Sequence, residues 1–220
     1  MHPTFAAIAR TATLLTLGYL VASAALVHDL DLFFHEGHGV EQASVGLLVG
    51  AIILWFWLAG EYRWREWQLP AALALMLARE LDFDKQFTDS GLLKLTTYTR
   101  DGTLETKVFG GLAILFTLWV GLRILRRNLP LWWSRLRQGA PDAWMLAIAM
   151  VCGVLAKTLD GLGRKLLDFD VHLPAFYDML SGRLEEVLEG VCYWLIVLAI
   201  ARLVVPSVRH EAGLAAVPAE

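Results

Sequence analysis

The chain has 220 residues, of which 57% are hydrophobic and only 19% are charged, and its mean hydropathy is +0.53. This composition lies outside the range of soluble globular domains and indicates a membrane protein with several spans. The formal net charge is −3, and no basic block with interleaved aromatic residues points to nucleic acid as a partner. Because each crossing needs roughly 20 residues, the length predicts one integral-membrane helical domain over residues 1–220.

Five apolar segments have the composition of transmembrane helices. They lie at 11–27, 44–60, 108–122, 143–156 and 190–201. The last two reach spanning length when flanking residues such as Lys157 and Arg202 extend toward the membrane surface. A sixth candidate, 67–78, is only twelve residues long, which fits an interfacial or re-entrant segment as well as a crossing. The prediction is an all-α transmembrane bundle of about six spans, five of them clear.

Three apolar segments end in similar short sequences: "HDLDLFF" at 28–34, "RELDFDKQF" at 79–87 and "RKLLDFDVHL" at 164–173. In this alignment Asp31, Asp82 and Asp168 correspond. If the likeness is a repeat, each copy is the exit of an odd-numbered span, and the first span belongs to the mature bundle. Two alternatives stay open: short matches in a leucine-rich chain also arise by chance, and the first span also fits a cleavable signal peptide.

Charge is divided unevenly between the two sides that six spans define. Loops after the odd spans hold nine bases and 17 of the 22 carboxylates, whereas the other side holds ten bases and five acids. The stretch 123–137 is compact and basic, with Trp132 and Trp133 as interfacial anchors, but 28–43 has no lysine or arginine. We therefore expect both termini in the cytoplasm and the acidic loops outside.

The segment "ARELDFDKQFTDSGLLKLTTYTRDGTLETKVFGG", residues 78–111, and the later "LEE" at 184–186 carry a resemblance. They resemble segments of a family of uncharacterised bacterial polytopic inner-membrane proteins. The resemblance implies a bacterial inner-membrane location and no mechanism.

Carboxylates near the predicted span ends form a candidate acidic patch. Its members are Asp31, Glu80, Asp82, Asp168, Glu186 and Glu189, with Glu41 beside them. Ionisable groups at membrane depth tend to face a bundle interior and are candidates for functional sites. The alternative is that groups near the span boundaries are ion pairs with Lys157 or Arg202, or solvated interfacial groups, that fix the register of the helices; these are Glu80, Asp160, Glu186 and Glu189. If the patch is real, it should hold a proton, a metal ion or a basic group of a partner.

The histidines of the first loop suggest a metal site. In "HEGHGVE", His35, His38 and Glu41 recur every three residues, and His28 lies close by in sequence. Two imidazoles and a carboxylate are ligands that a divalent cation such as zinc accepts, and His172 could complete the shell. Two glycines in this stretch disfavour a rigid helix, so histidines solvated in a loop are the alternative.

No catalytic signature is complete. "HEGH" places its histidines at i and i+3 instead of i and i+4, and no Gly-x-Ser-x-Gly elbow occurs. The sequence therefore favours a non-enzymatic accessory or transport-related membrane protein whose acidic and histidine-rich rim binds a cation or a basic partner. A membrane-embedded metal-dependent hydrolase is the alternative. The expected partners are the lipid bilayer and a protein subunit, which is either a different protein or a second copy of this chain.

Overall fold

The computed structural model describes residues 4–27, 33–34, 39–83, 98 and 103–215, with side chains described as far as Val204. The described residues are mostly helical and include no strand, which confirms the predicted all-α class. They fall into two compact units. We call Met1–Ala59 with Gly139–Glu220 the bundle unit, and Gly60–Gln138 the hairpin unit. The single domain predicted for the whole chain stays a prediction.

Five helices among the described residues are long and apolar enough to cross a membrane. They are α1 (Phe5–Val27), α3 (Gly39–Leu58), α6 (Leu104–Arg127), α8 (Pro141–Leu159) and, within α10 (Ala175–Ala215), the part Ala175–Val204. Each overlaps one of the five clear spans that the sequence predicts, so these five are confirmed as helices of spanning length. The chain is accordingly a membrane protein in its architecture.

The sixth candidate span becomes α5 (Gln68–Glu80), a helix of 13 residues. At a rise of 1.5 Å per residue it is about 20 Å long, shorter than the roughly 30 Å hydrocarbon core of a bilayer. The remaining helices are shorter still. They are α4 (Tyr62–Arg65), α7 (Leu129–Arg137) and α9 (Leu162–Leu167).

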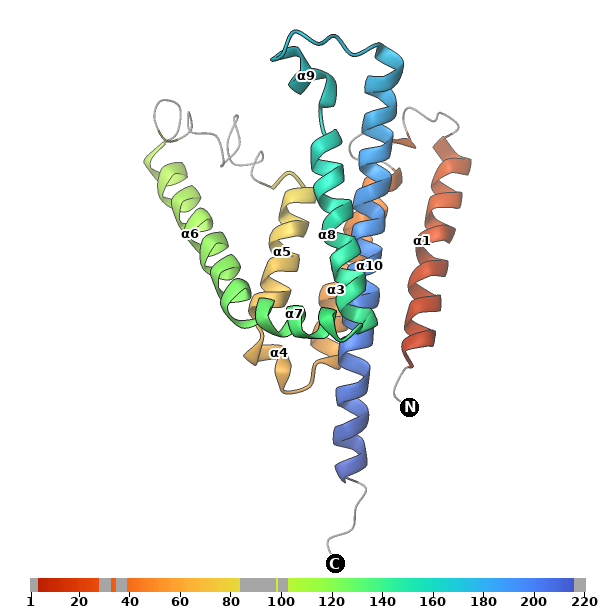
Figure 1. The fold of residues 1–220 in the computed structure, drawn as a ribbon, viewed down its shortest axis with the longest axis vertical. Helices are drawn as coiled ribbons and strands as arrows, with labels where there is room; N and C mark the ends of the chain where they lie inside the picture. Colours follow the sequence, from red (N-terminus) through yellow and green to blue (C-terminus); the bar gives the residue numbers. More distant parts are fainter. Residues whose placement is uncertain (1–3, 28–32, 35–38, 84–97, 99–102, 216–220) are drawn as a thin grey trace, which may run out of the picture. The chain divides into compact units, whose positions relative to one another are not determined.

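In the bundle unit, the long helices run in alternating directions in chain order (Figure 1). The Tyr19 hydroxyl near the end of α1 donates to Gln42 Oε1 near the start of α3, at 2.6 Å. The Trp194 indole of α10 donates to Thr13 Oγ1 of α1, at 3.1 Å. Since α8 and α10 also run in opposite directions side by side, α3 ends and α8 begins at the end of this unit where α1 begins.

The core of the bundle unit lies where α3, α8 and α10 meet. Ala51, Ala156 and Ala201, one from each helix, are fully inaccessible to solvent. Small residues let helix backbones approach closely, which is the usual basis of helix association in a bilayer. In contrast, α1 has no buried residue, so it covers the bundle without entering its core.

The hairpin unit pairs α5 with α6 in opposite directions (Figure 1). The α6 helix begins at an N-cap, because the Thr103 side chain accepts a hydrogen bond from the backbone N–H of Thr106 at 3.2 Å. Only Gly110 and Val120 of α6 are buried within the described residues. Many leucines and aromatics on the rest of α6 are exposed, an apolar surface of the kind that lipid acyl chains can cover.

Candidate functional site

A lysine surrounded by carboxylates joins the end of α8 to the first half of α10. The Lys157 ammonium lies 2.9 Å from Glu189 Oε1, 3.4 Å from Glu185 Oε1 and 3.4 Å from Asp160 Oδ2. Glu185 and Glu189 share a face of α10 because they are four residues apart. We call these four residues the acidic cluster. Glu189 is its most buried member, with 8% of its surface exposed.

The depth of the acidic cluster follows from the length of α8. Lys157 is seven residues beyond the middle of α8, or about 10 Å along the helix axis. The half-thickness of the hydrocarbon core is about 15 Å. If α8 is centred in the bilayer, the Lys157 backbone lies inside the hydrocarbon boundary, and its long side chain can place the ammonium near that boundary. Ionisable groups at or within the boundary of a membrane are candidates for functional sites.

The cluster agrees in part with the sequence expectation. Lys157 pairs with Asp160 and Glu189, as the alternative of register-fixing ion pairs predicts, and Glu185 joins them. Arg202, the other predicted partner, lies toward the opposite end of α10, where its guanidinium carbon is 5.1 Å from the centre of the Phe5 ring.

The remaining predicted site residues either lie outside the described residues or belong to separate helices and helix ends of the two units. His28, Asp31, His35 and His38 lie outside them, so most of the predicted metal site is not described. Within the described ranges, no group of three or more His, Cys, Asp or Glu side chains is arranged to hold a metal ion. The others are placed one by one: Glu41 in the first turn of α3, Glu80 at the end of α5, Asp82 just after it, Asp168 at the C-cap of α9, and Glu186 on α10. Their convergence on one patch stays a prediction.

The second and third copies of the proposed repeat share a helix ending, but not in the register of the sequence alignment. Asp82 and Asp170 both have a left-handed backbone, with φ of 47° and 58°. In each case the next residue donates its N–H to a carbonyl five residues back: Phe83 to Ala78, and Val171 to Leu166. This is the Schellman ending, in which a short polar residue such as aspartate tolerates the left-handed conformation. Its geometry equates Asp82 with Asp170, two residues beyond the aligned Asp168.

A second polar network closes one end of the hairpin unit. The Arg127 guanidinium contacts Glu66 through Nε, at 2.9 Å from Oε1 and 3.0 Å from Oε2, and through a terminal nitrogen at 2.7 Å from Oε1. Glu66 Oε2 also accepts from Gln68 at 2.7 Å and from Asn128 at 3.2 Å. Arg123 donates through Nε to Gln68 Oε1 at 2.9 Å. We call these five residues the Glu66 network.

The side chains of the Glu66 network are hydrogen-bonded to one another, and part of the network is buried. Gln68 is fully buried, and both ends of its amide are hydrogen-bonded. Burial alone would raise the pKa of Glu66, but hydrogen bonds from Arg127, Gln68 and Asn128 outweigh it and hold the pKa below its ordinary value of 4.5. Sequence reasoning missed this network. Its only signal is the polar "WREWQ" directly before the short apolar helix, together with "RRN" at 126–128.

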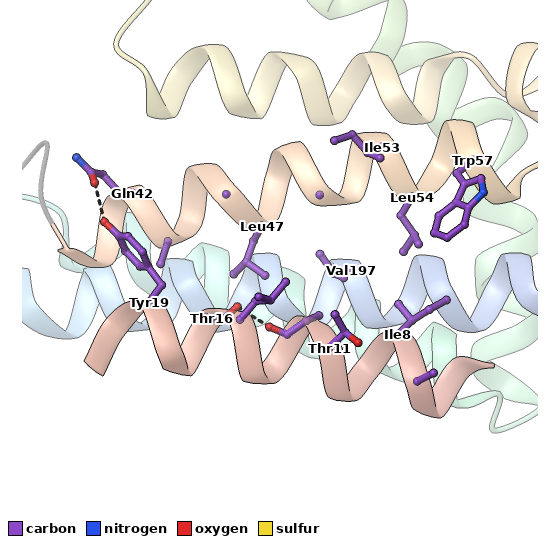
Figure 2. Close-up of a pocket in the computed structure, with 16 residues that line it drawn as sticks. Ile8, Thr11, Thr16, Tyr19, Gln42, Leu47, Ile53, Leu54, Trp57 and Val197 are labelled. Carbon is purple, nitrogen blue, oxygen red and sulfur yellow. Dashed lines mark hydrogen bonds between the residues drawn. The ribbon is translucent and has the colours of Figure 1, made fainter. Parts of the chain in front are cut away.

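An apolar groove of about 780 Å³ lies between α1 and α3, with Val197 contributed by α10 (Figure 2). Gly46 and Gly50 of α3 line it, and a Cβ at either position would meet nothing within 4 Å. The hydrogen bond between Tyr19 and Gln42 lies at one end. The lining is hydrocarbon with a few hydroxyl and amide groups, so the groove suits an apolar chain better than an ion.

No family model matches this sequence, and neither the comparison with curated proteins nor that with solved structures finds a match.

Proposed function

We propose that this chain is an integral membrane protein that binds a cation at the acidic cluster, in an accessory or transport-related role. The cation is either a small ion or the basic side chain of a partner subunit. The observation that carries the proposal is the convergence of three carboxylates on the single ammonium of Lys157.

The chemistry of the cluster supports a cation rather than a neutral ligand. Carboxylates held this close repel one another and favour positive charge between them, more strongly where water is scarce. Lys157 already fills that role from within the chain. The Lys157 side chain, which reaches the cluster from α8, can move aside when an incoming cation or proton balances the charge of the carboxylates. The site can in this way exchange the ammonium for another cation.

The proposed topology has six crossings. Because α3 ends and α8 begins at the same end of the bundle unit, the chain between them should cross the membrane an even number of times. The α6 helix is long enough to cross, so α5 with its flanking residues makes the other crossing of the pair. A helix of 13 residues requires local thinning of the bilayer, which costs fractions of a kcal/mol per Å.

The basic stretch 123–137 supports a cytoplasmic side for both termini. The resemblance of residues 78–111 to bacterial inner-membrane proteins supports that membrane as the location. In this topology the acidic cluster, Asp82 and Asp168 lie on the outer side.

Thermal unfolding in nanodiscs of zwitterionic lipid tests cation binding. The unfolding midpoint should be measured with Na⁺, K⁺, Mg²⁺, Ca²⁺, Zn²⁺ or arginine amide, the last standing for a partner's basic side chain. Choline chloride at equal ionic strength is the reference. A cation that binds only the folded state stabilises it by about 2.7 kcal/mol at a hundred times its dissociation constant. We expect at least one to raise the midpoint above the choline reference.

Substitutions test whether the cation-dependent shift of the unfolding midpoint arises at the acidic cluster. Glu189→Gln and Glu185→Gln should each reduce the cation-dependent shift, whereas Glu105→Gln, an exposed glutamate in the first turn of α6, should retain it. A midpoint that never differs from the choline reference, or an equal loss in the Glu105 control, would contradict the proposal.

Reporter fusions test the topology separately. A fusion after Glu61 should report the cytoplasm and a fusion after Asp82 the outside. If both report the same side, α5 is not a crossing and the six-span topology is wrong.

A further inference from the structure

The hairpin unit carries a basic and aromatic surface at the end where α5 begins and α6 ends. The short helices α4 and α7 both lie at that end (Figure 1). Residues 60–67 and 122–138 together hold seven arginines and two glutamates. One of the glutamates is Glu66, which is already held by Arg127 in the Glu66 network. This end of the unit is therefore strongly positive.

The α7 helix has the composition of a helix that lies in a membrane interface. Four of its apolar residues, Leu129, Trp132, Trp133 and Leu136, recur at i, i+3, i+4 and i+7, the spacing of one helical face, and Leu131 lies off this face. Trp133 is nevertheless 47% exposed. The guanidinium carbon of Arg137 lies 5.1 Å from the centre of the Trp133 ring. Since the apolar helix α6 ends at Arg127, α7 begins where that span leaves the hydrocarbon.

The α4 helix adds to the same surface. Its sequence is Tyr-Arg-Trp-Arg, and Trp64 is 71% exposed. The Glu66 network ties the residues after α4 to the end of α6, since Arg123 also donates to the carbonyl oxygen of Arg65 at 3.3 Å. The backbone of Arg65 and the α6 arginines Arg123 and Arg127 are thus held in place by hydrogen bonds within the unit before any ligand arrives.

We propose that this α4–α7 surface binds the headgroups of anionic phospholipids. Guanidinium groups donate to phosphate oxygens in a planar, paired arrangement, and each basic residue near a membrane surface favours anionic lipid. Exposed tryptophan and tyrosine belong at the level of the headgroups. An acidic protein would match the charge alone, whereas an anionic lipid also matches the exposed aromatic rings and the exit of α6 from the hydrocarbon.

Native mass spectrometry of the full chain tests the proposal. The protein in mild detergent is incubated with equal amounts of phosphatidylglycerol and phosphatidylcholine, and the ratio of the two lipids retained is measured. We expect phosphatidylglycerol to be enriched, less so at high salt because screening weakens surface charge. The triple variant Arg65→Gln, Arg126→Gln, Arg137→Gln should lower the ratio about fivefold or more.

The matched control removes three positive charges from the bundle unit: Arg164→Gln, Lys165→Gln and Arg183→Gln. It should retain the wild-type ratio. If the triple glutamine variant does not fold, the variant Arg65→Lys, Arg126→Lys, Arg137→Lys keeps the charge and should retain enrichment.

Three outcomes would overturn the proposal. They are a wild-type ratio near one, an equal loss in the bundle-unit control, and displacement of phosphatidylglycerol by millimolar glycerol phosphate. The last would show a site for free phosphate instead of a lipid surface.

Discussion

In the Glu66 network one carboxylate receives hydrogen bonds from an arginine and two amides, whereas in the acidic cluster one ammonium serves three carboxylates. Each network joins two helices of its own unit, and each lies near helix ends. Their difference is the balance of charge. In the Glu66 network the hydrogen-bond donors match the acceptors, whereas in the acidic cluster carboxylates outnumber basic groups among the described contacts.

This difference separates a structural role from a binding role. A satisfied network rigidifies a fold, because any change leaves a buried group without a partner. A cluster in which acids outnumber the base gains from an added proton or cation. We therefore expect substitutions in the Glu66 network to change stability under all ionic conditions, and substitutions in the acidic cluster to change the response to ions.

The largest expected effect is that of Glu66→Ala. It removes the acceptor of three donors and should lower the free energy of unfolding by about 2–3 kcal/mol. Titration with a denaturing detergent in mixed micelles measures this loss. Glu61→Ala, which changes an exposed glutamate five residues earlier, should stay within about 0.5 kcal/mol of wild type. Equal effects of the two substitutions would show that the network adds nothing.

A smaller loss is expected from Lys157→Met, about 1–2 kcal/mol, because the Lys157 side chain is 38% exposed and its ion pairs are therefore only partly shielded from solvent. The double variant with Glu189→Gln should recover part of the loss, since it removes a carboxylate that the ammonium had balanced. Additive effects of the two substitutions, measured in the same detergent titration, would contradict the coupling.

The five long spans and the pairing of Lys157 with Asp160 were predictable because they depend on local information, whereas the pairing with Glu189 rested only on both residues lying near predicted span ends. Hydropathy marks a span within its own residues, and Asp160 is three residues from Lys157. The Glu66 network was not predictable, because Glu66 and Arg127 are 61 residues apart and nothing local specifies their pairing.

The proposed repeat shows another limit of sequence. Matching letters align Asp82 with Asp168, but the helix ending is set by which residue adopts a left-handed backbone, and that residue is Asp170. Alternative alignments of a short acidic sequence look equally good, although only one places the left-handed residue where the last carbonyls of the helix accept hydrogen bonds.

Acid should weaken the Glu66 network by less than the removal of its carboxylate. The folded-state pKa of Glu66 lies below its ordinary value of 4.5, so its stabilisation is complete above that value and is lost as pH falls through the lower folded pKa. Unfolding midpoints measured from about pH 6 to about pH 3 should therefore converge for wild type and Glu66→Gln at the acidic end. A constant difference between the two would contradict the assignment.

The smallest expected effects come from glycines of the bundle unit, which test whether its acidic end is less tolerant than its groove. Gly50→Ala should stabilise the unit by about 0.5–1 kcal/mol, because alanine favours a helix and its Cβ meets nothing within 4 Å. Gly163→Ala should destabilise it, because a Cβ there would collide with the carboxylate of Asp178, whose Oδ1 accepts from the Gly163 N–H at 3.1 Å. The same detergent titration measures both. If Gly163→Ala is as stable as Gly50→Ala, the acidic end adapts as readily as the groove, and the contrast between a tight acidic end and an open groove does not hold.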